Sequence, residues 1–202
     1  DSAIENGDSH FEESLGLLEN KRVALFAKHA GVIYDTQAKS EQGVLDALTE
    51  HGVNVTAVLS PEHGFRGEED AGATVDDTID EKTGVPVHSL YRDGQTRMPD
   101  DAQMNTFDTL VIDIQDVGVR FYTYYLTMFD LMNACAAYGK NVVILDRVNP
   151  NGFYVDGPVL QNAFHSGVGR LPLPVVHGMT LGELALMFNG EGWLDTGADS
   201  LD

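Results

Sequence analysis

The sequence places a glutamate, a possible proton donor, directly after a predicted buried strand. Segment 60–64 (SPEHG) follows the apolar run 53–59, and its proline and glycine restrict the backbone around Glu62 and His63. A carboxyl group in a partly desolvated cleft has a raised pKa and can protonate a leaving oxygen at neutral pH. Glycoside hydrolysis requires such an acid. The alternative is that Glu62 pairs with Arg66 or caps a turn.

A second set of polar side chains follows the apolar run 108–114. Because side chains alternate along a strand, Asp113 and Gln115 are expected on one side and Ile114 and Asp116 on the other. A carboxylate at a strand end can orient a base, bind a hydroxyl group or cap the next helix. The next polar and aromatic residues could stack on a sugar and form hydrogen bonds with it. They are Arg120, Tyr122, Tyr124 and Tyr125. Core packing of the tyrosines is the alternative.

Two further polar segments lie next to predicted elements. Segment 146–152 (DRVNPNG) contains an Asp–Arg pair, for which internal bracing is the favoured role, and the amides of Asn149 and Asn151, which could face a ligand. His177 precedes a helix that is predicted to open with a capping box at 180–183 (TLGE). The histidine could point into a cleft or cover the start of that helix.

Apolar runs of strand length alternate with helical patterns along the chain. The predicted strands are 23–27, 53–59, 108–114 and 142–145, and the predicted helices are 40–51, 126–136 and a helix from 180 onward. This alternation predicts parallel βαβ units, and therefore an α/β fold with a doubly wound, mostly parallel sheet flanked by helices. Ligands of such sheets bind beyond the carboxyl ends of the strands. The polar segments are therefore expected to meet at one edge.

Composition excludes several classes of function. The net charge is −20, and such a chain would repel nucleic acid, which is therefore not an expected partner. No apolar run approaches the roughly 20 residues of a membrane span. The one cysteine, Cys135, lies in an apolar helical pattern and is expected to be a buried structural thiol. There is no G-x-G-x-x-G after the first strand, so dinucleotide binding is not expected. There is also no close pair of histidine ligands, and a metal site assembled from distant His and Asp residues stays the alternative.

Six segments carry a family resemblance in their order along the chain. They are SPEHGFRG (60–67), DAG (70–72), TGVPVHSLY (83–91), DIQDVGVRFYTY (113–124), LDRVNPNGFYVDGPVL (145–160) and LPLPVVHGMTLGELALMFNGEGWL (171–194). Together they resemble the DUF1343, or NamZ-type, exo-β-N-acetylmuramidases over about residues 21–194. The resemblance implies a Rossmann-like catalytic domain.

The resemblance also implies a reaction and its residues. Members of the family release β-1,4-linked N-acetylmuramic acid from the non-reducing ends of peptidoglycan fragments. The implied catalytic set is Glu62, His63 and Asp116, without cofactor or metal. The substrate-binding residues that we expect, some from the resemblance and some from their place after strand ends, are Lys28, His29, Arg66, Asp113, Gln115, Arg120, Tyr122, Asn149, Asn151 and His177. Glu62 is expected to act with the 2-acetamido group of the substrate, and the alternative uses Asp113 or Asp116 as a second carboxylate.

The chain also differs from the family pattern. Lys28-His29-Ala30-Gly31 stands where relatives usually carry Asn-x-Thr-Gly, and Val148 stands where they carry proline. We expect a polar lead-in with a short helix over 1–20, the catalytic domain over 21–194, and over 195–202 a linker to a second domain that closes the cleft. Peptidoglycan as partner implies a periplasmic or secreted location. The alternative function is a non-catalytic glycan-binding domain or pseudoenzyme.

Overall fold

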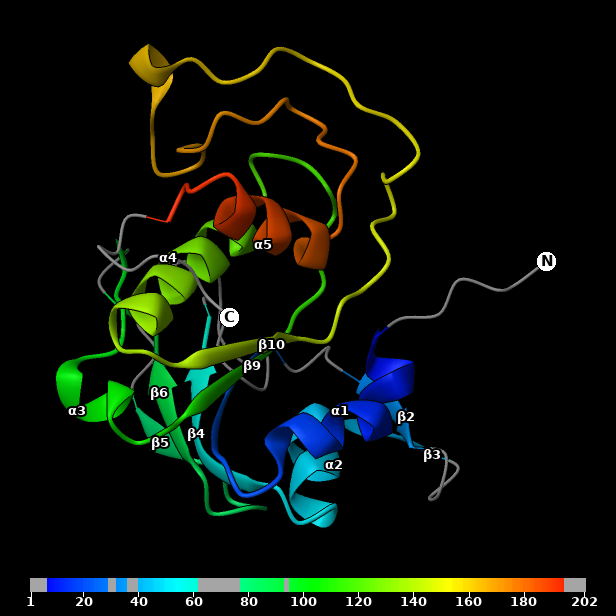
Figure 1. The fold of residues 1–202 in the computed structure, drawn as a ribbon, viewed down its shortest axis with the longest axis vertical. Helices are drawn as coiled ribbons and strands as arrows, with labels where there is room; N and C mark the ends of the chain where they lie inside the picture. Colours follow the sequence, from blue (N-terminus) through cyan, green and yellow to red (C-terminus); the bar gives the residue numbers. More distant parts are fainter. Residues whose placement is uncertain (1–6, 29–31, 36–39, 62–76, 93–94, 195–202) are drawn as a thin grey trace.

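One six-stranded sheet forms the centre of the molecule. The computed structural model describes residues 7–28, 32–35, 40–61, 77–92 and 95–194 (Figure 1). In the sheet the strands follow the order β10-β9-β1-β4-β6-β5. They are β1 (Arg22–Ala27), β4 (Asn54–Ser60), β5 (Thr78–Ile79), β6 (Pro86–Ser89), β9 (Thr109–Asp113) and β10 (Asn141–Ile144). All pairings are parallel except that of β5 with β6.

The strand order reverses between β1 and β9. From β1 the chain builds outward through β4 and β6, and it then returns to place β9 and β10 on the other side of β1. Leu25 of β1 lies beside Val58 of β4 on one side and Val111 of β9 on the other. This is the doubly wound, mostly parallel α/β sheet that the sequence predicts. Ligands of such sheets bind at the reversal, beyond the carboxyl ends of the strands.

Helices cover both faces of the sheet and define two hydrophobic clusters. They are α1 (Phe11–Leu18), α2 (Val44–Glu50), α3 (Asp101–Met104), α4 (Tyr124–Ala137) and α5 (Leu181–Gly190), with the short 3-10 helices η1 (Gly7–His10) and η2 (Asn162–Phe164). Ala24 and Phe26 of β1 pack in the cluster that contains residues of α4 and α5. Val23, Leu25 and Ala27 pack in the cluster that contains residues of α1 and α2. All side chains of β9 are buried. Polar groups that could meet a ligand therefore lie at or beyond the strand ends.

One local prediction differs from the structure, and several short strands had no prediction. The predicted helix 40–51 is wrong at its start, because β3 (Ser40–Gly43) pairs antiparallel with β2 (Val32–Asp35) before α2 begins. The apolar residues that suggested the helix all lie in its true part. The strand β6 has no sequence prediction, because it is only four residues long and starts with a proline. The small pair β7 (Tyr91–Arg92) and β8 (Gln95–Thr96) has none either.

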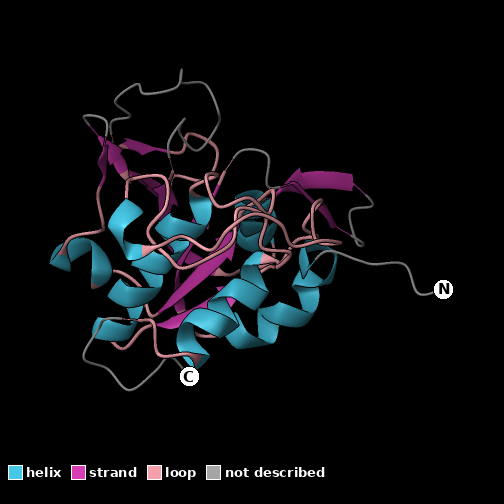
Figure 2. Cartoon of the chain, turned by 90° about the horizontal axis from the view of Figure 1, so that it is seen from above, coloured by secondary structure: helices cyan, strands magenta, loops and turns pink. Residues whose placement is uncertain are grey.

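A long connection between β10 and α5 lies against the helices with little regular structure. Figure 1 shows it as the yellow-to-orange trace beyond α5, and in Figure 2 pink loop segments run across the helices. Isolated bridges join Val176 to Val119 and to Asp156. Several of its apolar side chains are more than half exposed: Phe153, Val155, Val159, Phe164 and Val168.

Asp146 ties the start of this connection to the start of α5. Its Oδ2 accepts a hydrogen bond from Thr180 Oγ1 at 2.6 Å, and its Oδ1 accepts one from the backbone N–H of Gly182 at 2.9 Å. Thr180 also forms the predicted capping box with Glu183. A Cβ at Gly182 would lie 2.7 Å from Asp146 Oδ2, so the approach requires glycine. The bracing role predicted for Asp146 is therefore present. Within the described ranges, no helix is long and apolar enough to cross a membrane.

We expect Thr180→Ala to lower the free energy of unfolding by about 1–2 kcal/mol, because both the cap of α5 and the bond to Asp146 are lost. Thr180→Ser keeps the hydroxyl and is the matched control, expected within about 0.5 kcal/mol of the parent. Urea unfolding followed by circular dichroism measures both. Equal stability of the alanine and serine variants would contradict this account of the cap.

Candidate active site

The carboxyl edge of the sheet brings four segments of the chain together. Lys28 follows β1, Pro61 follows β4, Asp113 ends β9 and Asp146 lies two residues beyond β10. Because the four strands are parallel neighbours, these residues lie at the same edge. Four predicted site residues lie outside the described residues: His29, Glu62, His63 and Arg66. Their roles stay predictions.

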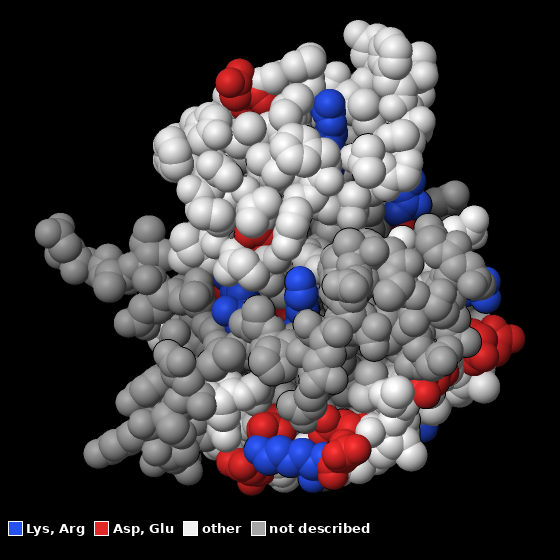
Figure 3. Space-filling model, turned by 180° about the vertical axis from the view of Figure 1, so that it is seen from behind, with Lys and Arg blue, Asp and Glu red and all other residues white. Residues whose placement is uncertain are grey.

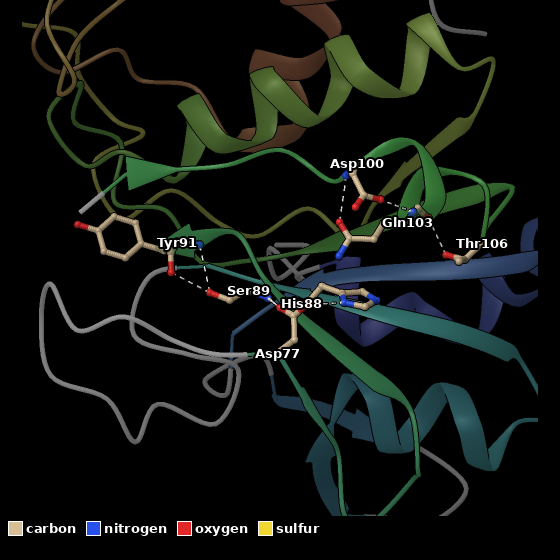
Figure 4. A network of polar contacts seen from close by, with 7 residues as sticks. All are labelled: Asp77, His88, Ser89, Tyr91, Asp100, Gln103 and Thr106. Carbon is tan, nitrogen blue, oxygen red and sulfur yellow. Dashed lines mark hydrogen bonds and ion pairs between the residues drawn. The ribbon is translucent and has the colours of Figure 1, made fainter. Parts of the chain in front are cut away.

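Both ends of the segment that contains Glu62 are held at the carboxyl edge. At its start, the carbonyl of Ser60 accepts a hydrogen bond from the backbone N–H of Leu90. At its end, Asp77 contacts the last residues of β6, as Figure 4 shows. Asp77 Oδ1 accepts from the Ser89 backbone N–H at 2.9 Å, and Oδ2 lies 3.2 Å from Nδ1 of His88. Sequence analysis missed this clamp, because neither Asp77 nor His88 stands in a recognisable chemical pattern.

A buried ion pair fixes the end of β9. The Arg147 Nε donates to Asp113 Oδ1 at 2.7 Å, and its Nη2 donates to Oδ2 at 3.2 Å. The Asp113 side chain is fully buried and that of Arg147 is 9% exposed. Removal of one partner from such a pair leaves an uncompensated charge in the interior. Asp113 is thus engaged by both of its oxygens, and the predicted bracing by Arg147 takes place across two strand ends.

Asp116 has a different environment. Its side chain is buried, and its Oδ1 accepts a hydrogen bond from the backbone N–H of Gly118 at 2.7 Å. Among the described residues, no group donates to Oδ2. Burial raises the pKa of this carboxyl to about 6, against the opposing effect of hydrogen bonds from the Gly118 and Val117 backbone. A carboxyl with that pKa can both donate and accept a proton near neutral pH.

Two more polar atoms without a described partner lie near Asp116. They are the hydroxyl of Tyr125 and Nε2 of His177, both on buried residues. The rings are tilted with centroids 6.3 Å apart, and the His177 backbone N–H donates to the carbonyl of Gly118. Because Nδ1 of His177 accepts from the Met179 backbone N–H, the neutral ring carries its proton on Nε2. Burial lowers the pKa of His177 and raises that of Tyr125 to about 12.

The side-chain amides that were predicted to bind substrate donate hydrogen bonds to backbone carbonyls. Asn149 Nδ2 donates to the carbonyl of Met179, Asn151 Nδ2 donates to that of Val117, and Gln115 Nε2 donates to that of Val148. Gly118 has a φ of 74°, and a Cβ there would overlap the Asn149 side chain. These amides therefore set the path of the backbone around Asp116. Their contact with substrate stays a prediction.

Arg120 forms hydrogen bonds with the long connection between β10 and α5. Its Nη1 donates to the carbonyls of Pro158 and Leu173, at 2.9 and 2.6 Å. Its backbone N–H donates to the carbonyl of Val175. The guanidinium thus joins two stretches of the connection beside the site.

Lys28 and two tyrosines form the remaining described part of the site. The Nζ of Lys28 lies 5.6 Å from the centre of the Tyr124 ring, and Tyr122 packs edge-on against the same ring with centroids 5.1 Å apart. Burial raises the pKa of Tyr122, Tyr124 adds to this rise, and the Lys28 charge opposes it. A small cavity beside this group is lined by Pro61, Leu90, Tyr91, Thr96, Thr123, Tyr124 and Thr127.

Other features of the described residues carry no chemistry. Cys135 is buried, and burial raises the pKa of its thiol to about 12, so it is a structural residue as expected. A larger hollow, formed by the end of α1, the start of β1 and the end of α2, lies at the amino edge of the sheet. In the ranges that the structure describes, no group of three or more His, Cys, Asp or Glu side chains could hold a metal ion.

Comparison with known proteins gives one consistent family. The model of the family described as exo-β-N-acetylmuramidase NamZ, N-terminal, matches residues 23–201. The peptidoglycan β-N-acetylmuramidase NamZ of Bacillus subtilis (strain 168) is 46% identical over 180 residues, which are 88% of this chain and 42% of that protein.

Solved structures agree. A DUF1343 family protein of Bacteroides fragilis NCTC 9343 superposes with a TM-score of 0.84 at 49% identity, over 100% of this chain and 50% of the other. A second one from the same organism gives 0.83 at 38% identity, over 96% and 48%. The chain thus spans about half the length of these relatives.

The raised pKa of Asp116 predicts a pH-dependent stability. The folded state binds a proton more tightly than the unfolded state, whose pKa is 3.8. The resulting stabilisation is therefore complete below about pH 4 and is lost as the pH rises through about 6. Asp116→Asn cannot titrate. Its free energy of unfolding, relative to the parent, should rise by about 1–3 kcal/mol between pH 4 and pH 7. A difference that stays constant with pH would contradict the buried, raised carboxyl.

Proposed function

Because the chain belongs to the NamZ N-terminal family of exo-β-N-acetylmuramidases, we propose that it carries the catalytic edge of a peptidoglycan glycosidase. The proposed reaction releases β-1,4-linked N-acetylmuramic acid from the non-reducing ends of peptidoglycan fragments. The observation that carries the proposal is the 46% identity to a named peptidoglycan β-N-acetylmuramidase over 88% of this chain. The polar groups collected at the carboxyl edge of the sheet support it, because that edge is where ligands of this fold bind.

In the proposed mechanism, Glu62 is the general acid. It protonates the glycosidic oxygen as the bond to C1 breaks, and the carbonyl oxygen of the substrate's own 2-acetamido group closes onto C1. Glu62, now a carboxylate, then takes a proton from the water that opens this cyclic intermediate. Such substrate assistance explains why one glutamate can serve both steps. Its position directly after β4 and Pro61 supports the assignment, since the clamp at Asp77 holds the other end of the same segment.

The described geometry favours Asp116 over Asp113 as a second carboxyl. Both oxygens of Asp113 accept from Arg147, so this carboxylate is held in a structural pair. Asp116 has one oxygen without a described partner and a pKa of about 6. We propose that Asp116 polarises the acetamido group, and that His177 and Tyr125, whose buried polar atoms have no described partner, help to bind the sugar beside it. His63, His29 and Arg66 are proposed to complete the site.

A second domain is part of the proposal. The relatives are about twice as long as this chain, and the connection between β10 and α5 exposes five large apolar side chains. Where exposed apolar side chains adjoin one another, they commonly mark an interaction surface. We propose that a second domain packs there and closes the cleft, and that the protein works outside the cytoplasmic membrane, where peptidoglycan lies. The competing function is glycan binding without hydrolysis.

We expect Glu62→Gln to lower turnover of a chromogenic β-N-acetylmuramide by roughly 10²–10⁴, because the shape is kept and the acid is lost. Glu191→Gln, at an exposed position after α5, is the matched control and should keep full turnover. The assay is run on the 202-residue chain and on a longer chain that carries the proposed second domain. If both chains bind glycan but release no chromophore, the protein is a glycan-binding domain and not an enzyme. If Glu62→Gln keeps full activity, Glu62 is not the general acid.

We expect Asp116→Asn to lower turnover by roughly 10² or more, with the parent releasing the β-anomer of the sugar first. Retention of configuration follows from assistance by the acetamido group. Asp156→Asn, an exposed carboxylate on the neighbouring connection, is the control. Proton NMR during the first minutes of the reaction distinguishes the anomers. Release of the α-anomer would instead make a carboxylate the base that activates water, and an unimpaired Asp116→Asn would remove this residue from the mechanism.

A further inference from the structure

We propose that Lys28 binds the carboxylate of an acidic amino sugar and thereby makes the site prefer muramic-type sugars over neutral hexosamines. The inference rests on the proposed function and deepens it. N-acetylmuramic acid differs from N-acetylglucosamine by a lactyl ether on O3, which ends in a carboxylate. Discrimination between the two sugars therefore needs a group that interacts with one negative charge, and the described site contains such a group.

Lys28 occupies the point of the sheet where ligands are expected. It follows the last residue of β1, and β1 is the strand at which the strand order reverses. Its neighbours across the edge are the residue after β4, which precedes Glu62, and the end of β9 at Asp113. An ammonium group here lies at the same edge of the sheet as Pro61 and the segment that carries the proposed second carboxyl.

No carboxylate among the described residues neutralises the charge of Lys28. Its described contact is the face of the Tyr124 ring, and no described carboxylate lies within ion-pair distance of it. The other cations of the edge are engaged: Arg147 pairs with Asp113, and Arg120 donates to two backbone carbonyls. The ring face holds the ammonium in place without accepting a conventional hydrogen bond, so its N–H groups can donate to an anion.

The charge of the whole protein makes this cation matter. At a net charge of −20 the molecule repels an anionic sugar, and Figure 3 shows acidic side chains gathered at the margins of one face. A carboxylate can bind only where a local positive charge offsets that field. Tyr122 and Tyr124 stand edge-to-face beside Lys28, so a sugar could stack on an aromatic surface while its carboxylate reaches the ammonium. A half-buried cation in that position supplies specificity by charge.

The test compares two substrates that differ only in this charge. They are a 4-nitrophenyl β-N-acetylmuramide with its free lactyl carboxylate and the same compound with that group converted to the carboxamide. For Lys28→Met, kcat/KM should fall roughly ten- to a hundred-fold on the acid and less than about three-fold on the amide, because one charge-assisted contact is lost. Lys28→Arg should recover part of the preference.

Lys140→Met is the matched control, since Lys140 also lies over an aromatic ring, that of Phe107 at 5.9 Å, but belongs to the turn before β10. It should leave the ratio of the two substrates unchanged. Binding of free N-acetylmuramic acid and of N-acetylglucosamine, measured by calorimetry on the full-length protein, tests Lys28 without catalysis. If the parent protein releases no sugar but binds the acid preferentially, and Lys28→Met loses that preference, the proposed hydrolysis is wrong and the role of Lys28 stands. Equal losses on acid and amide, or an unchanged binding preference in Lys28→Met, would overturn the proposal.

Discussion

The two-sided burial of β1 and β9 is the constraint on which the rest of the structure depends. Strands that pack between two layers of helices can carry polar groups only where they end. The buried pair of Asp113 and Arg147 then fixes where that end lies, because it joins the last residue of β9 to the segment after β10. An unpaired Asp113 would be a charge in the interior, so the pair determines the position of the following backbone as strongly as any apolar contact.

The backbone beyond the pair is held by side chains in place of regular structure. Gln115, Asn149 and Asn151 each donate to a carbonyl of a neighbouring loop, and Arg120 donates to two. Buried loop backbone needs such partners, since it has no strand or helix neighbour to satisfy it. These side chains therefore stabilise the loop backbone, although sequence reasoning predicted that they bind a ligand. Asp116 and His177 stand apart from them, because each keeps a polar atom that no described residue engages.

The sequence predicted the architecture well but not the contacts between the candidate site residues, for physical reasons. A run such as 109–113 is apolar on both faces, so its position inside a parallel sheet follows from local pattern alone. The capping box of α5 is also local, and it was confirmed. The hairpin of β2 and β3 was missed, because the pairing of 40–43 with β2 overrode the helical pattern of 40–51. Asp113 and Arg147 are 34 residues apart, and spacing does not reveal such a contact.

The same distinction separates the two carboxyl groups at the end of β9. Sequence alternation put Asp113 and Asp116 on opposite sides, but it could not say which of the two carboxyl groups has a raised pKa. That property depends on whether a cation or only backbone N–H groups face the carboxylate. Both aspartates are buried, but Asp113 faces Arg147 and Asp116 faces backbone N–H groups. A carboxyl that is desolvated without a cationic partner costs the fold stability. A neutral amide at the position of Asp116 would avoid that cost.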